Sequence, residues 1–351
     1  MNSLLYRFNK LFNNVRLNED IENIELIIFS AENEIALSHL NMWLPFLIES
    51  KVHFVCICTN YKAFIKIKIC YPTLNVIYVK NKDSLSLIVN RFSNLKACLY
   101  LSNIGKNINM IDAVNQFEIK HIFIGHGDSD KSASAHKFFR IYDEIWTAGE
   151  AGKDRFLNKK ILLKHLIFKS VGNPRLKSLL QLNFKKTNKQ SINILYLPTW
   201  TGVYKEQDYS SLSIMKSILA ELQLRFSAQI IIKFHPRTEK DFFKDLNLKN
   251  SQLYIFEKSI SELLPESNIY ICDISASVSE ALAMDRPIFL YIPKNKNIDM
   301  AKSNMEYKNY TYTFSDKSEL ISKMEEVLNE NDYLKEGRAL ARQYILGEKK
   351  Y

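Results

Sequence analysis

Residues 25–59 contain two short apolar stretches, Glu25–Ser30 (ELIIFS) and Lys51–Thr59 (KVHFVCICT), on either side of a helical pattern at Glu34–Glu49. Both stretches are nearly continuous runs of β-branched, aromatic and other apolar residues. Such runs are typical of strands that are buried on both faces of a sheet. Because a helical pattern separates them, they indicate parallel strands joined by a crossover helix. This part of the chain therefore predicts a doubly wound α/β fold.

The alternation of strands and helices continues, breaks once and then starts again. A polar, basic stretch at Leu180–Ser191 (LQLNFKKTNKQS) separates the two series and is typical of a linker. Because 351 residues exceed the usual size of one domain, we expect two, over residues 1–185 and 186–351. Two such units place ligands beside the carboxyl ends of their strands, in the cleft between the halves. Further strands are expected at 74–79, 97–102, 120–124 and 144–147, and then at 192–197, 229–234, 252–256, 268–272 and 287–291.

Two helix starts in the second half are predicted from capping residues. Ser259 and Glu262 have the spacing of a capping box, and Asp316 and Glu319 occupy the N-cap and N3 positions of another helix. Apolar residues at helical spacing follow Glu319, which indicates one buried face.

The composition indicates a globular protein that meets a negatively charged partner. Apolar residues make up 46% and charged residues 25%, and no apolar run approaches the roughly 18 residues that span a bilayer. No secretory signal is recognisable, so we expect a cytoplasmic protein. The net charge of +10 suits a polyanion, a phosphorylated substrate or an anionic membrane surface. Zinc-finger, RNP-type and helix-turn-helix motifs are missing, so nucleic acid is not an expected partner.

A histidine between two glycines follows the strand expected at 120–124. Gly125 and Gly127 allow the backbone to turn tightly and to approach a ligand closely. The imidazole of His126, with an unperturbed pKa of about 6.5, suits a general base at this position. The alternative is a turn in which His126 only caps neighbouring backbone. Four other histidines lie in periodic or apolar contexts and are interpreted as packing or surface residues: His39, His53, His121 and His165.

A basic motif, Ile232–Arg237 (IKFHPR), closes a strand of the second half. Pro236 forces His235 into an extended conformation. Lys233, His235 and Arg237 offer three cationic groups that can neutralise a pyrophosphate or a leaving phosphate. The alternative is a basic strand end that faces solvent.

Hydroxyl residues lead from another strand into a helix at Asp273–Glu280 (DISASVSE). Serine hydroxyls and the first backbone N–H groups at the start of a helix commonly bind anions, so Ser275 and Ser277 predict an anion site here. Glu280 would lie one to two turns inside the helix, where a carboxylate can accept hydrogen bonds from ribose hydroxyls. The alternative is an ordinary N-cap with a solvated Glu280.

Taken in order, these motifs resemble the CDP-glycerol glycerophosphotransferase family, which includes teichoic-acid polymerases and TagF-like capsule polymerases. The resemblance covers roughly residues 119–295. The matching segments are His126-Gly127, Tyr142-Asp143-Glu144, Gly172–Arg175 (GNPR), Leu197–Trp200 (LPTW), Lys233–Arg237, Asp273-Ile274-Ser275 and Arg286-Pro287-Ile288. P-loop, dinucleotide-binding and α/β-hydrolase motifs are missing, so those classes lose support.

The resemblance implies a GT-B fold, with two Rossmann-like domains facing across a cleft, and a nucleotide donor held by the second domain. It implies a CDP-activated polyol phosphate, CDP-glycerol or CDP-ribitol, as donor and a hydroxyl of a polyol or glycan as acceptor. It requires no cofactor and leaves a divalent metal open. The catalytic residues that it implies are His126, as base, and His235. The donor-binding residues are Thr199, Lys233, Arg237, Asp273, Ser275, Ser277 and Glu280, with Gly127, Asp128 and Arg175 as further candidates.

Two departures from the family pattern stand out. The family often has two adjacent serines where this chain has Ser275-Ala276-Ser277, and Gly127–Lys131 (GDSDK) is more acidic than the usual Gly-Thr-Pro. Two other functions therefore stay open. One is a GT-B glycosyltransferase that uses a nucleotide sugar such as CMP-sialic acid, and the other is a non-catalytic protein that binds polyanions.

Residues 1–17 (MNSLLYRFNKLFNNVRL) predict an amphipathic helix with a broad apolar face and three basic residues. Such a helix suits the surface of an anionic membrane, which predicts peripheral contact with the inner face of the cell membrane. The alternative is a helix that packs on the first half of the chain.

Overall fold

The computed structural model divides the chain into two compact units. The first comprises Met1–His126, Lys137–Trp146 and Leu163–Lys169, and the second Gly127–His136, Thr147–Leu162 and Ser170–Tyr351. The structure describes residues 23–114, 118–161, 165–176, 179–180, 192–202, 204–238, 248, 251–255, 257–294 and 297–348. The predicted boundary after residue 185 and the predicted helix at 1–17 both lie outside the described residues and stay predictions.

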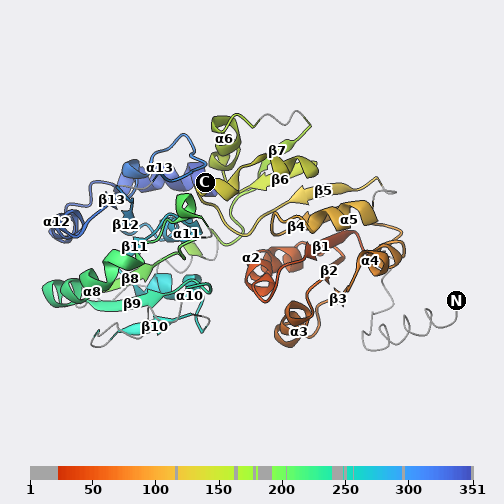
Figure 1. Ribbon diagram of the computed structural model, residues 1–351, viewed down its shortest axis with the longest axis horizontal. Coiled ribbons are helices and arrows are strands. Elements are labelled where there is room, and N and C mark those ends of the chain that lie inside the picture. The colour runs from red at the N-terminus through yellow and green to blue at the C-terminus, as the bar shows by residue number, and fades with distance from the viewer. Residues whose placement is uncertain are drawn as a thin grey trace. The chain divides into compact units, whose positions relative to one another are not determined.

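The first unit is built on a sheet in the order β3-β2-β1-β4-β5-β6-β7 (Figure 1). Its strands are β1 (Leu26–Ser30), β2 (Phe54–Cys58), β3 (Val76–Tyr78), β4 (Ala97–Tyr100), β5 (Lys120–Phe123), β6 (Glu144–Thr147) and β7 (Ile167–Ser170). Neighbouring strands from β3 to β6 pair in parallel. The chain runs outward from β1 to β3 and returns to β4, so the strand order reverses between β1 and β4. Ligands of doubly wound sheets bind at such a reversal.

Four helices of the described residues connect successive strands from β1 to β5. They are α2 (Ala36–Glu49), α3 (Tyr61–Cys70), α4 (Lys82–Val89) and α5 (Asn107–Ala113). In α2, Leu40, Trp43, Leu44 and Leu47 share one face and pack against residues of β1, β2 and β4. This spacing is that of an amphipathic helix, and full burial of each such side chain contributes roughly 1.5–3 kcal/mol.

The second unit is built on a parallel sheet in the order β10-β9-β8-β11-β12-β13. The strands are β8 (Asn193–Leu197), β9 (Gln229–Lys233), β10 (Gln252–Tyr254), β11 (Ile269–Cys272), β12 (Ile288–Tyr291) and β13 (Tyr312–Phe314). The main helices are α6 (Glu150–Asn158), α8 (Leu212–Phe226), α10 (Ile260–Leu263), α11 (Ala276–Leu282), α12 (Lys317–Leu328) and α13 (Lys335–Leu346). Here the strand order reverses between β8 and β11.

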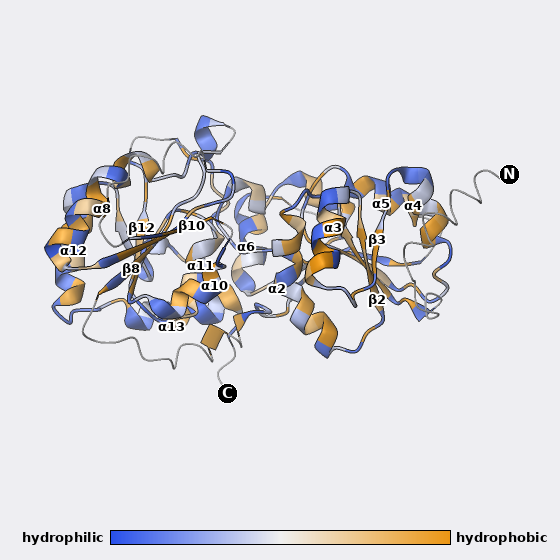
Figure 2. Ribbon diagram, turned by 90° about the horizontal axis from the view of Figure 1, so that it is seen from below, coloured by the Kyte–Doolittle hydropathy of each residue, from blue (hydrophilic) through white to orange (hydrophobic). Residues whose placement is uncertain are grey.

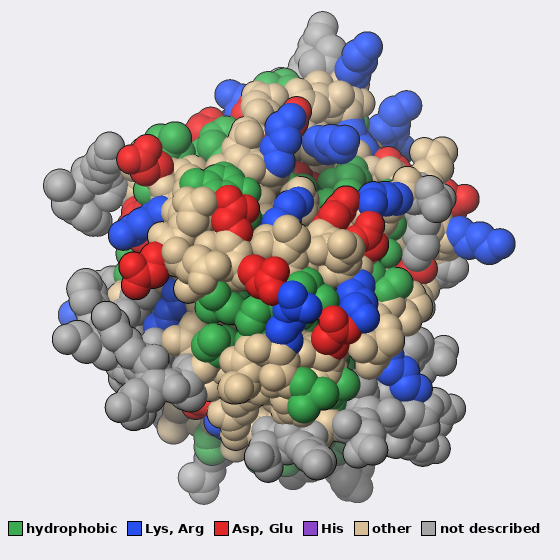
Figure 3. Space-filling view, turned by 90° about the vertical axis from the view of Figure 1, so that its left-hand side faces the viewer, with side chains coloured by type: hydrophobic (Ala, Val, Ile, Leu, Met, Phe, Trp, Pro, Cys, Tyr) green, Lys and Arg blue, Asp and Glu red, His purple; other side chains and the backbone are tan. Residues whose placement is uncertain are grey.

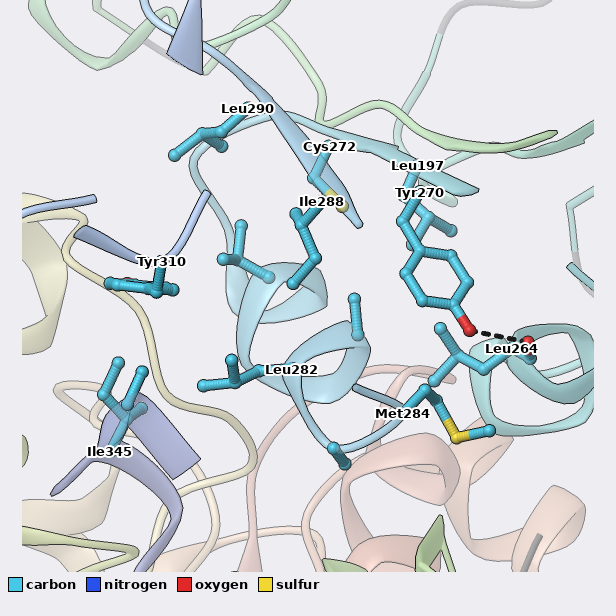
Figure 4. Close-up of a cluster of buried hydrophobic side chains, with 14 of the residues drawn as sticks. Leu197, Leu264, Tyr270, Cys272, Leu282, Met284, Ile288, Leu290, Tyr310 and Ile345 are labelled. Atoms are coloured by element: carbon cyan, nitrogen blue, oxygen red, sulfur yellow. Dashed lines mark hydrogen bonds between the residues drawn. The ribbon is translucent and has the colours of Figure 1, made fainter. Parts of the chain in front are cut away.

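Alternate residues of this sheet belong to two cores, one on each face. Ile194 and Tyr196 pack with α8 and α12, whose apolar and polar sides are visible in Figure 2. Leu195 and Leu197 pack with α11 and α13 in the core drawn in Figure 4. Successive side chains of a strand point to opposite faces of the sheet, and here both faces are buried, so these strands are apolar throughout. The fold class is confirmed: both units are doubly wound α/β sheets.

Both predicted helix starts are confirmed. Ser259 and Glu262 form the capping box of α10, and the Asp316 side chain accepts a hydrogen bond from the Glu319 backbone N–H at 3.0 Å, at the start of α12. The face of the second unit drawn in Figure 3 mixes Lys and Arg with Asp and Glu side chains. Of the helices within the described residues, none combines the length and the apolar character needed to cross a bilayer.

Candidate active site

Three loops of the second unit leave the carboxyl ends of β9, β8 and β11, which are neighbours in the sheet. They carry His235 after β9, Thr199 after β8 and Asp273 after β11. Because parallel strands end at the same edge, three motifs that are far apart in the sequence meet where the strand order reverses. The predicted donor-binding residues of these loops therefore lie at one edge of one sheet.

Asp273 ties two of these loops together. It is completely buried, and its carboxylate accepts hydrogen bonds from the Thr199 backbone N–H at 2.8 Å and from the Ser211 backbone N–H at 3.2 Å. Burial raises the pKa of Asp273 to about 7, although these hydrogen bonds and the charge of Lys131 act in the opposite direction. Asp273 thus fixes the backbone after β8.

Lys131 reaches the same edge from the segment that follows the predicted base. Its ammonium donates a hydrogen bond to the Thr199 hydroxyl at 2.8 Å and lies 5.3 Å from the ring centre of Tyr209. Desolvation lowers the pKa of Lys131 to about 8, against the attraction of Asp273. The sequence does not single out Lys131, because this residue lies in a polar stretch and its partner Thr199 is distant in the chain.

His235 is a half-buried imidazole among positive charges. Desolvation, followed by the charges of Lys131, Arg237 and Lys233, lowers its pKa to about 4. Its Nδ1 accepts a hydrogen bond from the Arg237 backbone N–H at 3.1 Å, so the proton of the neutral ring is on Nε2. The ring also stacks on Trp200, with centroids 6.2 Å apart, and the Arg237 guanidinium lies 5.1 Å from the Trp200 ring centre. His235 is therefore a neutral hydrogen-bond donor in a strongly positive field.

Two predicted donor-binding residues have partners within the unit. The Lys233 ammonium donates a hydrogen bond to the Ile255 carbonyl, and desolvation lowers the pKa of Lys233. Glu280 forms an ion pair with Arg175 at 3.4 Å, and its side chain is 17% exposed. Burial raises the pKa of Glu280, while Arg175 and then Lys233 lower it. Glu280 and Arg175, selected for separate reasons, are thus brought together.

The start of α11 is held by its own serines. Ser275 is the N-cap residue; its hydroxyl accepts a hydrogen bond from the Ser277 backbone N–H at 3.3 Å and lies 2.6 Å from the Ser277 hydroxyl. A Cβ on Gly127 would lie only 2.8 Å from the Cβ of Ala276. The close approach of the two backbones therefore requires glycine at position 127.

The acidic residues that depart from the family pattern are neutralised inside the second unit. The Arg155 guanidinium bridges Asp128 at 2.5 Å and Asp130 at 2.7 Å, and Arg155 is 4% exposed. The Ser279 hydroxyl donates a hydrogen bond to the Asp128 carbonyl at 3.0 Å. Asp128 and Asp130 thus anchor the segment that carries Lys131, which gives the acidic departure a structural explanation.

His126 is the last residue of the first segment of the first unit and follows the end of β5 by three residues. Its Nδ1 is 2.6 Å from the Leu101 carbonyl oxygen, which can only accept, so Nδ1 carries a proton and Nε2 is the basic atom of the neutral ring. Desolvation lowers the pKa of His126, and the Leu101 hydrogen bond and the charge of Glu32 raise it. A partly exposed, neutral imidazole with a free Nε2 can take a proton from a hydroxyl.

Among the residues that the structure describes, no cluster of three or more His, Cys, Asp or Glu side chains is placed to hold a metal ion. The second unit thus gathers cations, hydroxyls and a histidine donor at one edge of its sheet. The first unit carries a histidine whose Nε2 is unprotonated in the neutral ring. These features define a GT-B protein with a candidate phosphate site at a sheet edge.

The family is shown by sequence. The model of the CDP-glycerol:poly(glycerophosphate) glycerophosphotransferase family matches residues 167–346, just over half of the chain, and the chain belongs to this family. The match includes the loops after β8, β9 and β11, and it confirms the resemblance found in the motifs. As a member of this family the chain is a transferase. Among curated proteins, none matches the chain.

Solved structures show the fold. A variant of the wall teichoic acid polymerase TagF, soaked with CDPG, is similar with a TM-score of 0.60 and 13% identity, over 99% of this chain and 91% of that one. UDP-GlcNAc 2-epimerase from Neisseria meningitidis, bound to UDP-GlcNAc, has a TM-score of 0.59 and 13% identity, over 89% and 93%. The UDP-GlcNAc 2-epimerase from Methanocaldococcus jannaschii has a TM-score of 0.56 and 14% identity, over 91% and 98%. These likenesses support the GT-B fold.

Proposed function

We propose that this chain transfers a polyol phosphate from CDP-glycerol or CDP-ribitol to a hydroxyl group of a cell-surface glycan or teichoic-acid-like polymer, with release of CMP. The observation that carries the proposal is the position of His235 within the matched range. Desolvation and then the charges of three cations, Lys131, Arg237 and Lys233, lower the pKa of this imidazole to about 4, so positive charge gathers at this edge of the sheet. A pyrophosphate with its negative charges is the ligand that this potential favours.

The donor is proposed to bind the second unit. His235 and Arg237 would hold its pyrophosphate, with hydroxyl groups of Thr199, Ser275 and Ser277 as further donors. Glu280, held by its ion pair, would accept hydrogen bonds from the ribose. Asp273 and Lys233 would support these groups through their backbone contacts. The proposal needs no cofactor, because the protein's own cations supply the positive charge.

His126 is proposed to be the general base. Its Nε2 takes the proton of the acceptor hydroxyl, and the oxygen attacks the phosphorus that bears the polyol. A new P–O bond forms, the bridging P–O bond to CMP breaks, and the proton passes from His126 to solvent. Fixed positive groups and positioning provide most of such an acceleration, and a base typically adds 10²–10⁴-fold.

The proposal is tested by binding and turnover. Calorimetry with CDP and CMP should show tighter binding than with UDP and GDP, and CMP should be released from CDP-glycerol or CDP-ribitol when an acceptor is present. His126→Ala should lower kcat and leave donor affinity nearly intact, whereas His235→Ala should weaken donor binding as well. Turnover of CMP-sialic acid alone would favour the glycosyltransferase, and full activity of His126→Ala would contradict the assignment of the base.

We also propose that the chain works in the cytoplasm, in peripheral contact with anionic lipid. The apolar and basic pattern of residues 1–17 suggests this contact, and α3 supports it. Its residues Tyr61, Ile65 and Ile69, one turn apart, are 58%, 37% and 72% exposed. The helix has three lysines and no acidic residue. An exposed apolar row beside lysines is the pattern of an interfacial helix.

A further inference from the structure

Helix α2 of the first unit brings a second histidine against His126. His39 lies near the start of this helix and is 9% exposed. Its ring stacks on that of His126, with centroids 3.5 Å apart and planes inclined by 10°. The two imidazoles are therefore in contact across their whole faces. The sequence pattern indicates only a packing or surface residue at position 39.

Both rings are anchored to consecutive residues of the loop after β4. His126 Nδ1 donates to the Leu101 carbonyl at 2.6 Å, and His39 Nδ1 lies 3.1 Å from the Ser102 hydroxyl. The loop itself is held by Asn107, whose amide donates to the Ser102 carbonyl at 2.6 Å. Two consecutive residues of one loop, through a backbone carbonyl and a side-chain hydroxyl, thus fix one edge of each ring.

The same face of α2 holds the residue before His126. Trp43 lies four residues after His39, and its indole N–H donates a hydrogen bond to the Gly125 carbonyl at 2.8 Å. Residues four apart share a helix face. Trp43 therefore fixes the backbone that leads into His126, and His39 covers its ring.

We propose that His39 is a positioning residue for the base: its ring fixes the plane of His126 and thereby the direction in which Nε2 points. The proposal rests on the proposed function only for the use of His126 as a base. A single hydrogen bond at Nδ1 leaves the ring free to tilt about that bond, since the second torsion of histidine is broad. A flat side chain in contact with the ring removes this freedom. Misplacement of a reacting atom by about 1 Å can cost roughly 10²-fold in rate.

Different polar groups are in contact with the two rings. The charged group that acts on His126 is Glu32, from the turn after β1, and its negative charge favours the protonated ring. The His39 ring meets the hydroxyl of Ser102, on the loop after β4. Substitutions at position 39 keep Glu32 and change the packing of the His126 ring. Without that packing the ring can tilt, and its hydrogen bond to the Leu101 carbonyl is then lost part of the time.

The test compares His39→Ala, which removes the ring, with His39→Phe, which keeps a flat ring but loses Nδ1, in the full chain. His53→Ala, an exposed histidine of the same unit, is the matched control. Long-range ¹H–¹⁵N spectra of histidine-labelled protein report which nitrogen of His126 is protonated. We expect the Nδ1–H form in the wild type, in His39→Phe and in the control, and a mixture of forms in His39→Ala.

Turnover gives a second measurement, with CMP release from CDP-glycerol as the probe. His39→Ala should lower kcat by about 10–100-fold with KM changed less than about twofold, and His39→Phe should stay within about threefold of the wild type. An unchanged His126 spectrum in His39→Ala would overturn the proposal whatever the rates. If the chain releases no CMP, the proposed donor is wrong, and the spectra alone decide the role of His39.

Discussion

Replacing Gly127 by alanine tests how closely the segment that begins there approaches α11. The new Cβ would lie 2.8 Å from the Cβ of Ala276. Since carbon atoms in contact normally lie about 3.5–4.0 Å apart, one of the two backbones would have to move by roughly 0.7–1.2 Å. Overpacking of this kind costs about 1–3 kcal/mol. For a unit of this size, each kcal/mol lowers Tm by about 2–4 °C, so we expect a fall of about 2–12 °C.

The double variant Gly127→Ala, Ala276→Gly is the control, because it moves the methyl group from one side of the contact to the other. Ala276→Gly alone should cost no more than about 1 kcal/mol, the usual difference between the two residues in a helix. We expect the double variant to lose less unfolding free energy than the two single variants lose together. Thermal unfolding of the four proteins measures this coupling. Additive losses of Tm would refute the reasoning.

The remaining predictions concern charge. Lys131→Met should raise the pKa of His235 from about 4, because it removes one of the charges that lower this pKa. The control Lys153→Met, at an exposed position of α6, should leave the pKa of His235 unchanged. NMR titration of the imidazole measures the pKa in both variants. The pKa of His235 is lower in the folded chain than in the unfolded chain, so the unfolded chain binds the proton first as the pH drops. The free energy of unfolding should therefore fall between about pH 6.5 and about pH 4. Urea unfolding across this range should show a smaller loss in Lys131→Met. Ile69→Glu should weaken co-sedimentation of the full chain with anionic vesicles, and Leu224→Glu, 82% exposed on the second unit, should not; equal effects would contradict a specific role for α3.

The strands and caps were predictable because their signals are local. The two faces of strand β8 (Asn193–Leu197) pack into two different cores, so every residue after Asn193 is apolar. Five consecutive residues are therefore enough to predict this strand. The capping residue Asp316 acts on a backbone group three residues away. By contrast, β7 and β13 were not predicted. They are edge strands, and Ile167–Ser170 is largely exposed while Tyr312–Phe314 has only three residues, so neither presents a long apolar run.

The candidate site was predictable as a set of strand-end motifs but not as a set of contacts. His235, Thr199 and Asp273 were found because each follows an apolar strand. Lys131 was missed because its partner Thr199 lies 68 residues further along the chain. His39 was missed for the same reason: helical periodicity indicates that a side chain faces inward, but it does not indicate what the side chain meets. Both contacts depend on the order of the strands, which the pattern of a single sequence leaves undetermined.

The two histidines show how backbone contacts can give one residue type two different tasks. At His126, Nδ1 meets a carbonyl oxygen, which accepts, so the neutral ring exposes an unprotonated Nε2. At His235, Nδ1 meets a backbone N–H, which donates, so the neutral ring exposes a protonated Nε2. Desolvation and then the positive charges around His235 keep that ring neutral near pH 7, and desolvation lowers the pKa of His126 against the Leu101 hydrogen bond and the charge of Glu32. A transfer to phosphorus needs one group that accepts a proton and another that donates a hydrogen bond without losing its own. The opposite tautomers would supply these two groups, and this supports the proposal that His126 is the base and that His235 binds the donor phosphates.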